Sequence, residues 1–234
     1  MNVLDFFFPK YCIQCKKFGD YICANCFATI SFDVKTKCFV CGGQAIDGMT
    51  HPGCQRTLTI DGVFSAVAYK RIMKKFLYQM KYKPYLTTLI PLAGELMQEA
   101  LIQDELFVGL LNKNPVLVPI PLSKGKLRKR GYNHASLLAK EMGKRFNLPV
   151  KNLLERVKET KPQYGLKREE RVKNMHEAFG MKPHPSPLLK GEGNQGTILL
   201  IDDVVTTGST LVEAARILKK NGYERVFGVT LAQD

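Results

Sequence analysis

The sequence predicts an α/β protein in which a mostly parallel sheet is flanked by helices and preceded by a small cysteine-rich domain. From about residue 61 onward, apolar runs of strand length alternate with segments of helical periodicity. All seven cysteines, by contrast, lie between positions 12 and 54. A chain of 234 residues accommodates one ordinary domain with a small attachment. We therefore expect an N-terminal domain over residues 1–60 and an α/β domain over residues 61–234.

The composition indicates a globular protein and excludes several other classes. Hydrophobic residues make up 45% and charged residues 24% of the chain, which excludes a disordered, collagen-like or disulfide-dense protein. No apolar run reaches the roughly 20 residues that span a bilayer, so no membrane span is expected. Asp5 interrupts the first apolar stretch, and no basic residues precede it, so the sequence predicts no secretory signal. We expect a cytoplasmic protein whose cysteines are reduced and bind metal.

The net charge of +14 is concentrated in two segments. Residues 70–83 contain six basic and no acidic residues, and residues 123–173 contain 16 basic and five acidic residues. This concentration favours an anionic partner such as phosphate, diphosphate or a nucleic-acid backbone. The alternative is that both segments are ordinary solvated helix faces.

The cysteines are regularly spaced in pairs that predict two zinc sites. The pairs are Cys12 with Cys15, Cys23 with Cys26, Cys38 with Cys41, and His51 with Cys54. A CxxC turn directs two thiolates at one point, and two such turns complete a tetrahedral zinc site. The first four cysteines would form one site, and the last three with His51 would form the other. Because the protein supplies every ligand, we expect structural Zn²⁺; the alternatives are buried thiols or redox pairs, and a loop role for His51.

The first half of the α/β domain predicts two strands and three helices. The strand 63–69 is an apolar run that follows Asp61-Gly62, and the helix 72–80 is amphipathic and basic. A second helix follows over 91–101, and the strand 116–121 is apolar and ended by prolines. The helix 134–146 has apolar residues at helical spacing, namely Ala135, Leu138, Ala139 and Met142.

The second half predicts two strands around one helix. Residues 198–201 form a continuous apolar run, and 226–231 form a further strand. The helix 209–221 between them has Leu211, Ala214 and Leu218 on one face and Gly222 as its C-cap. Residues 182–196 are rich in Pro and Gly and lack periodicity, so we expect a surface loop or insertion.

The stretch after the apolar run 198–201 predicts a phosphate site. Asp202 and Asp203 follow the predicted strand, and a hydroxyl- and glycine-rich loop then opens a helix; its residues are Thr206, Thr207, Gly208, Ser209 and Thr210. Ligands of α/β sheets bind at this edge, and a helix N-terminus favours phosphate. Two carboxylates would repel a ligand that is only a phosphate. They suit a ligand that also presents vicinal hydroxyls and binds with Mg²⁺, as a ribose 5-phosphate would. The alternative is an ordinary strand–helix turn with an Asp or Thr cap.

This stretch resembles the phosphoribosyl-pyrophosphate (PRPP) motif of type I phosphoribosyltransferases, an apolar strand followed by Asp-Asp-x-x-x-Thr-Gly-x-Thr. Residues 118–133, with Pro119-Ile-Pro121 and Arg130-Gly-Tyr-Asn133, and residues 160–179 are similar to two further segments of one subfamily. With an N-terminal double zinc ribbon, this is the layout of the ComF (ComFC) competence-protein family. The resemblance covers roughly residues 4–180 and 197–232 and implies a type I phosphoribosyltransferase-like sheet.

The resemblance implies a role for each matching residue. Asp202 and Asp203 would hold the ribose hydroxyls, and Thr206 to Thr210 would hold the 5-phosphate, with Mg²⁺ bound together with PRPP. The pyrophosphate would lie near Pro121, Ser123 and Lys124. A mobile hood would contain Arg128, Arg130, Arg168 and Arg171. Two positions depart from the family pattern: His134 replaces a Gln, and His51 replaces a zinc-ribbon Cys.

Two functions follow from the resemblance. ComF-type proteins are implicated in natural transformation, where they handle internalised single-stranded DNA; the implied partners are PRPP, single-stranded DNA and other competence proteins such as a DNA helicase. The alternative is an enzyme that transfers phosphoribosyl from PRPP to a nitrogen acceptor, although no acceptor pocket is recognisable in the sequence, so turnover stays open. Six aromatic residues near the basic segments are candidate base-stacking platforms or core residues: Phe76, Tyr78, Tyr82, Tyr85, Tyr132 and Tyr164.

Overall fold

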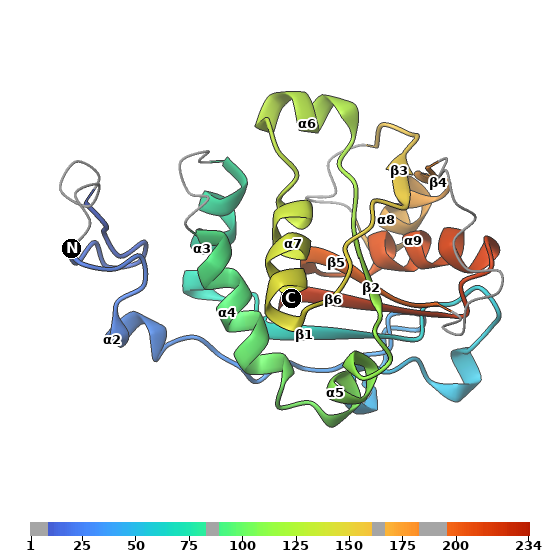
Figure 1. Cartoon of the computed structure of the whole chain (residues 1–234), viewed down its shortest axis with the longest axis horizontal. Helices are drawn as coiled ribbons and strands as arrows, with labels where there is room; N and C mark the ends of the chain where they lie inside the picture. The colour runs from blue at the N-terminus through green and yellow to red at the C-terminus, as the bar shows by residue number, and fades with distance from the viewer. Residues whose placement is uncertain (1–8, 83–88, 161–166, 183–195) are drawn as a thin grey trace.

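A four-stranded parallel sheet forms the centre of the molecule (Figure 1). The computed structural model describes residues 9–82, 89–160, 167–182 and 196–234. The strand order is β1 (Gly62–Ala68), β6 (Arg225–Gln233), β5 (Thr197–Val205) and β2 (Val116–Pro119), and each neighbouring pair is parallel. The predicted α/β fold with a mostly parallel sheet is therefore confirmed.

Helices cover both faces of this sheet. On one face α3 (Arg71–Tyr82), α4 (Leu89–Leu101), α5 (Glu105–Leu111) and α7 (His134–Phe146) enclose a core with Leu199 and Ile201 of β5. On the other face α9 (Ser209–Lys220), α8 (Arg168–Met175) and the small antiparallel pair β3 (Leu154–Arg156) and β4 (Phe179–Met181) enclose Ile198 and Leu200. Because both faces of β5 are buried over residues 198–201, this part of the strand is continuously apolar rather than alternating.

The structure differs from the sequence prediction at the end of β5. The strand continues to Val205, so Asp202 and Asp203 lie within it rather than after it. Pairing with β6 persists there, since Asp202 is opposite Thr230 and Val205 is opposite Gln233. Successive side chains of a strand point to opposite faces, so the two carboxylates have different surroundings.

In the described chain after residue 61, five short elements lack a sequence prediction, namely α5, α6 (Lys124–Arg130), α8, β3 and β4. They are three to eight residues long, which is too short for a clear hydrophobic period. Helix α6 is defined by its ends instead: Ser123 accepts a hydrogen bond from the Lys126 amide, and Gly131 closes the helix at φ +78°. Residues 183–195 of the predicted loop lie outside the described residues.

The N-terminal ribbon contacts both faces of the sheet. It contains the short helices α2 (Ala24–Phe27), η1 (Ile46–Gly48) and η2 (Pro52–Cys54). Cys12 and Cys26 belong to the core on the α3 face, whereas Phe39 belongs to the core on the α9 face. The ribbon is also tied to both ends of β1, because the Ala68 amide donates to Ser31 and the Thr50 amide donates to Asp61. Across the described residues, no helix combines the length and apolar character that a membrane span requires.

Candidate functional site

A cavity of about 680 Å³ opens at the carboxyl end of the parallel strands. Ligands of open α/β sheets bind at this end. The lining contains six basic and three acidic side chains, together with hydroxyl and apolar groups. These residues are Tyr69, Lys74, Lys81, Ile120, Pro121, Leu122, Lys126, Arg130, His134, Arg156, Arg171, Asp202, Asp203, Val204, Thr206, Thr210 and Asp234. The excess of basic groups gives the cavity the character of an anion site.

The loop between β5 and α9 forms a small hollow beside this cavity. The hollow measures about 30 Å³ and is lined by residues 202 and 204–211. Gly208 adopts φ +76° at the start of α9, a conformation that favours glycine. The hydroxyls of Thr207 and Ser209 lie 3.2 Å apart, and the first amides of α9 have no partner within the helix. Hydroxyls and amides at a helix N-terminus are suited to bind phosphate.

Asp203 is a buried carboxylate held by two cationic or polar partners. Its side chain is 4% exposed, its Oδ2 atom lies 2.5 Å from Lys81 Nζ, and its Oδ1 atom lies 3.3 Å from His134 Nε2. Burial alone would raise the pKa of Asp203, but Lys81 and His134 outweigh it and hold the pKa far below its usual range. Asp203 is therefore ionised.

Asp202, although adjacent, is in a different electrostatic state. Burial and the negative charge of Asp203 together raise the pKa of Asp202 to about 8. Its Oδ1 atom accepts a hydrogen bond of 2.9 Å from the Asp203 amide. The two neighbouring carboxyl groups thus combine one permanent negative charge with one group that takes up or releases a proton near neutral pH.

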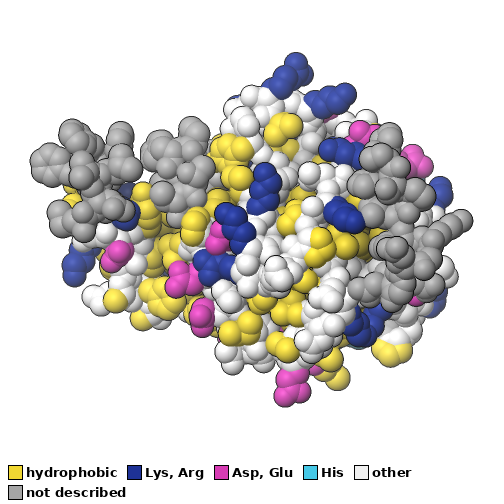
Figure 2. All heavy atoms as spheres, in the orientation of Figure 1, with side chains coloured by type: hydrophobic (Ala, Val, Ile, Leu, Met, Phe, Trp, Pro, Cys, Tyr) yellow, Lys and Arg dark blue, Asp and Glu magenta, His cyan; other side chains and the backbone are white. Residues whose placement is uncertain are grey.

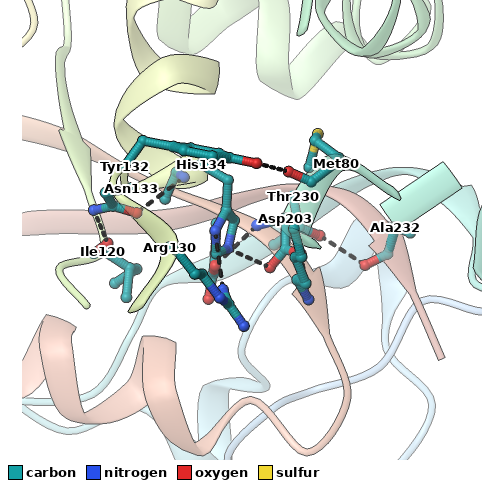
Figure 3. Close-up of polar contacts among 12 residues, drawn as sticks. Met80, Ile120, Arg130, Tyr132, Asn133, His134, Asp203, Thr230 and Ala232 are labelled. Carbon is teal, nitrogen blue, oxygen red and sulfur yellow. Dashed lines mark hydrogen bonds and ion pairs between the residues drawn. The ribbon is translucent and has the colours of Figure 1, made fainter. Parts of the chain in front are cut away.

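His134 links Asp203 to Arg130 (Figure 3). Arg130 Nη1 lies 3.3 Å from His134 Nδ1, and a guanidinium has only donors. His134 Nδ1 therefore accepts, and Nε2 carries the proton that points to Asp203. Arg130 Nη2 also donates to the Tyr82 hydroxyl at 3.3 Å. A chain of polar contacts thus runs from α6 through α7 to β5, and Lys81 continues it to α3.

The turn between α6 and α7 is fixed by two side chains, as Figure 3 also shows. Asn133 Nδ2 donates to the Ile120 carbonyl at 2.9 Å, and Asn133 Oδ1 accepts from the Ala135 amide and so caps α7. The Tyr132 hydroxyl donates to the Met80 carbonyl at 2.6 Å. The Arg-Gly-Tyr-Asn segment singled out in the sequence thereby ties α6 and α7 to β2 and α3 and orients Arg130 and His134.

The structure brings together most of the site residues that the sequence predicts. The cavity is lined by Pro121, Arg130, Arg171, Asp202, Asp203, Thr206 and Thr210, and the adjoining hollow is lined by Thr207, Gly208 and Ser209. Ser123 is buried as the cap of α6, whereas Lys124 and Arg128 are exposed on α6 and do not line the cavity. On the face drawn in Figure 2, basic side chains project at the top, where Figure 1 shows α6.

The two arginines on α8, Arg168 and Arg171, have different partners. Arg171 lines the cavity, and its Nη1 atom donates to Thr206 Oγ1 at 2.6 Å. Arg168 does not line the cavity; its Nη2 atom donates to the carbonyls of Phe39 and Val40 at 3.3 and 3.0 Å. Helix α8 therefore connects the loop 206–210 with the ribbon.

Sequence reasoning did not single out Lys81, Lys126 and Arg156, although all three line the cavity. Lys81 lies in a segment recognised only by its charge, and Lys126 lies in the segment 118–133, where the resemblance points to other residues. Arg156 lies on the three-residue strand β3, and its Nε atom is buried with no hydrogen-bond partner in the described part of the chain. Burial lowers the pKa of Arg156. A buried donor without a partner is costly, and an anion in the cavity would satisfy it.

The aromatic residues divide into core and surface. Phe76 is fully buried, so it serves the core and not as a stacking platform. Tyr78 and Tyr82 are exposed on α3, with ring centroids 5.0 Å apart, and Tyr132 is half-buried. Tyr85 and Tyr164 lie outside the described residues. Tyr78 borders a hollow of about 310 Å³ between α3 and the ribbon, whose other lining residues are Ile13, Lys16, Lys74, Lys75 and Gln79.

The cysteine-rich clusters have the arrangement that the spacing predicts. Cys12, Cys15, Cys23 and Cys26 place their four sulfur atoms within 4.8 Å of one another, and the ligand atoms of Cys38, Cys41, His51 and Cys54 do the same. His51 Nε2 lies 2.8 Å from the Gln44 carbonyl, which only accepts, so Nε2 carries the proton and Nδ1 is left as a ligand atom 3.4 Å from Cys41 Sγ. Both clusters fit tetrahedral structural zinc.

Thiol ionisation also fits a divalent cation. Burial would raise the pKa values of Cys12 and Cys38, but hydrogen bonds from neighbouring backbone amides lower them to about 6 and about 7. Burial and neighbouring thiols raise the pKa of Cys26 to about 12 and that of Cys54 to about 11. When thiols lie close together, the negative charge of one thiolate raises the pKa of the next thiol. A bound cation offsets this repulsion between thiolates.

Two family models match separate parts of the chain. A phosphoribosyl transferase domain model matches residues 100–234, and a double zinc ribbon domain model matches residues 3–56. The prediction of structural zinc is thereby supported from two directions, by the family model and by the ligand clusters.

Curated relatives include proteins of three bacteria. The chain is 36% identical to Competence protein F of Haemophilus influenzae over 47% of this chain and 46% of that protein. It is 38% identical to Competence protein ComFC of Bacillus subtilis over 47% of this chain and 41% of that protein. The match to DNA utilization protein YhgH of Escherichia coli is 27% identical and spans 86% of this chain and 85% of that protein. The chain thus matches less than half the length of the two competence proteins.

The phosphoribosyl transferase model covers more than half of the chain, and the zinc ribbon model covers most of the segment before it. Relatives named as competence and DNA utilization proteins are similar to this chain in sequence. The chain therefore belongs to the phosphoribosyl transferase domain family and, within it, to the ComF family.

Proposed function

We propose that the chain binds PRPP together with Mg²⁺ in the 680 Å³ cavity and acts in DNA uptake, handling internalised single-stranded DNA in the cytoplasm. We propose further that residues 1–60 and 61–234 are its two domains. One observation carries the PRPP assignment. Asp202 and Asp203 lead into the hydroxyl-rich loop 206–210 inside a cavity with six basic side chains. The chemistry of this set is that of a ribose phosphate site.

Each part of PRPP has a complementary group in the cavity. The 5-phosphate would occupy the hollow formed by residues 206–210, where hydroxyls and the amides of α9 converge. The ribose hydroxyls would donate hydrogen bonds to Asp202 and Asp203. The pyrophosphate would extend toward Lys126, Arg130 and Arg156, all of which line the same cavity. Arg156 Nε, which is buried without a partner among described residues, would gain one.

Mg²⁺ fits the proposed ligand because it prefers oxygen donors and binds through carboxylates and phosphates together. Asp202 supplies a carboxyl group at the cavity wall, and its pKa of about 8 would fall when a cation approaches. The ligand itself would supply the remaining oxygens. The neutralising charge would also lower the cost of placing a polyanion next to two carboxyl groups.

A surface next to the cavity supports the DNA part of the proposal. Tyr78 and Tyr82 are exposed on α3, and Lys74, Lys75 and Lys16 line the adjoining hollow. Exposed aromatic rings among basic side chains bind single strands by stacking and by neutralising phosphates. The relatives named for competence and DNA utilization support the same role. Other competence proteins, such as a DNA helicase, are the proposed protein partners.

Calorimetry with PRPP and Mg²⁺ tests the cavity assignment. Replacing both Asp202 and Asp203 by Asn should abolish binding while the zinc content stays unchanged. Asp47→Asn is the matched control, since Asp47 is exposed on the ribbon and its φ of +49° suits Asn. Undiminished binding by the double variant would refute the assignment.

An assay of pyrophosphate release by the wild-type chain decides whether the chain only binds PRPP or also turns it over. Pyrophosphate released from PRPP in the presence of ammonia or an amine acceptor would identify the phosphoribosyltransferase alternative. A chromosomal deletion, complemented with the wild-type chain or with the double variant, would show whether transformation requires the chain and whether it requires the cavity. Normal transformation by the deletion strain would refute the role in DNA uptake.

A further inference from the structure

One turn of the ribbon lies directly against the loop 206–210, the proposed phosphate loop. Phe39 follows Cys38, one of the zinc ligands, and is only 4% exposed. Its ring belongs to the same hydrophobic cluster as Val205 and Leu211, which flank the loop. A Cβ atom at Gly208 would collide with the Phe39 ring. The ring therefore lies on the backbone of the residue that begins α9, and it can do so only because that residue is glycine.

Helix α8 makes a second connection between the same turn and the same loop. Arg168 donates two hydrogen bonds to the turn, to the carbonyls of Phe39 and Val40. One helical turn later, Arg171 donates to the hydroxyl of Thr206, at the start of the loop. A Cβ atom at Gly42 would collide with the Arg168 guanidinium, so this contact is also close. The turn thus contacts the loop directly at Gly208 and is connected to Thr206 through helix α8.

We propose that the Cys38–Cys41 turn positions the phosphate loop, with Phe39 as the positioning residue, so that phosphate binding depends on the second zinc site. This inference rests on the function proposed for the cavity. Loop amides bind a phosphate well only if they already point at it before the ligand arrives. Two backbone hydrogen bonds, between Cys38 and Gly43 and between Gly42 and Cys38, shape the turn, and the four metal ligands would hold it closed.

The first zinc cluster provides a control within the same chain. Cys12 and Cys26 pack with α3 on the opposite face of the sheet. Among the described residues, none of that cluster lines the cavity or the hollow at residues 202–211. Its loss should remove one zinc and leave the phosphate loop in place.

The two zinc sites can be compared directly. Cys38→Ser with Cys41→Ser removes ligands from the second site, and Cys15→Ser with Cys23→Ser removes ligands from the first. Each variant should lose one equivalent of zinc by elemental analysis. PRPP affinity, measured by calorimetry, should fall about tenfold, or about 1.4 kcal/mol, only in the second-site variant. Equal losses in both variants, or a loss confined to the first-site variant, would overturn the proposal.

Phe39 variants keep the proposal testable if a cysteine variant fails to fold. Phe39→Ala and Phe39→Leu should both retain two zincs. Phe39→Ala should weaken PRPP binding about tenfold, and Phe39→Leu, which fills most of the space, should restore it. Hydrogen exchange at residues 206–209, measured without ligand, should accelerate in Phe39→Ala but not in Phe39→Leu. Unchanged exchange in Phe39→Ala would refute the inference.

The exchange measurement also separates this inference from the proposed function. If the wild-type chain failed to bind PRPP while Phe39→Ala still loosened residues 206–209, the function would be refuted and the positioning role of Phe39 would stand. If the wild-type chain bound PRPP and Phe39→Ala bound it equally well, the positioning role would be refuted and the function would stand.

Discussion

The ammonium group of Lys81, on α3, lies 2.5 Å from the Oδ2 atom of Asp203, on β5. The side chain of Asp203 is 4% exposed and that of Lys81 is 20% exposed, so the pair is largely screened from water. Burial would lower the pKa of Lys81, but Asp203 outweighs it and raises that pKa. The chain thus supplies its own cation to a carboxyl pair that is expected to meet Mg²⁺ when PRPP binds.

Removing this internal cation should make the fold dependent on magnesium. Lys81→Met leaves a buried carboxylate without its strongest partner and should cost on the order of 2 kcal/mol, less than a fully buried pair because Lys81 is partly exposed. Millimolar Mg²⁺ should restore much of the loss, as read by thermal unfolding with and without the ion. Lys75→Met, at an exposed position on the same helix, is the control. A Lys81→Met variant whose melting temperature ignores Mg²⁺ would contradict this expectation.

The carboxyl group of Asp202, which is proposed to bind PRPP, should lower the stability of the fold at high pH. Its pKa is about 8 in the folded chain, well above the ordinary value, so the fold binds its proton more tightly than the unfolded chain does. Stability is therefore lost as the pH rises from about 4 toward 8. Asp202→Asn removes this loss and should raise the free energy of unfolding by about 1 kcal/mol near pH 8.

The measurement is thermal unfolding without added Mg²⁺ at pH 5.5, 7 and 8.5. The gain in melting temperature of Asp202→Asn over the wild-type chain should increase with pH. The same variant should bind PRPP more weakly than the wild-type chain. Asp47→Asn should show no such trend. A gain that shrinks with rising pH would show that Asp202 is ionised in the fold.

His134 should be replaceable by glutamine but not by leucine. Its Nε2–H points to Asp203, and its Nδ1 accepts from Arg130. A glutamine amide offers one donor and one acceptor as well, so His134→Gln should keep PRPP affinity within about threefold. His134→Leu leaves both partners unsatisfied and should cost about 1–3 kcal/mol of stability. Calorimetry and thermal unfolding report the two effects, and equal behaviour of the two variants would exclude this role.

The exposed side of α3 should bind single-stranded DNA independently of the cavity. Tyr78→Ala should weaken binding of a labelled oligonucleotide by about 1–3 kcal/mol, as expected for a lost stacking ring. Lys75→Gln should reduce the slope of log affinity against log salt by about 1. Fluorescence anisotropy over a salt series measures both quantities, and PRPP binding is the control. An affinity that salt does not change would remove the electrostatic basis of the assignment.

The sequence predicts the parts of the site that are contiguous in the chain. The loop 206–210 is recognisable because its hydroxyls, its glycine and the preceding carboxylates form one local pattern. Lys81 is one of six basic residues in segment 70–83, and no local pattern tells which of them faces Asp203. Arg156 raises the same difficulty, because the strand β3 that carries it is only three residues long and shows no clear period. Arg168 is indicated by the resemblance alone, and its partners, the carbonyls of Phe39 and Val40, lie far away in the sequence. Phe39 is buried only because Gly208 leaves room for its ring.

The position of β6 in the sheet has a consequence for biosynthesis. This strand follows all the others in the chain, yet it lies between β1 and β5, so the sheet cannot close until residues 225–233 have left the ribosome. Until then, Phe64 on β1 lacks its neighbour Phe227, and the two halves of the sheet present unpaired edges. A nascent chain that stops before β6 would therefore expose two open strand edges at once, one on each side of the missing strand.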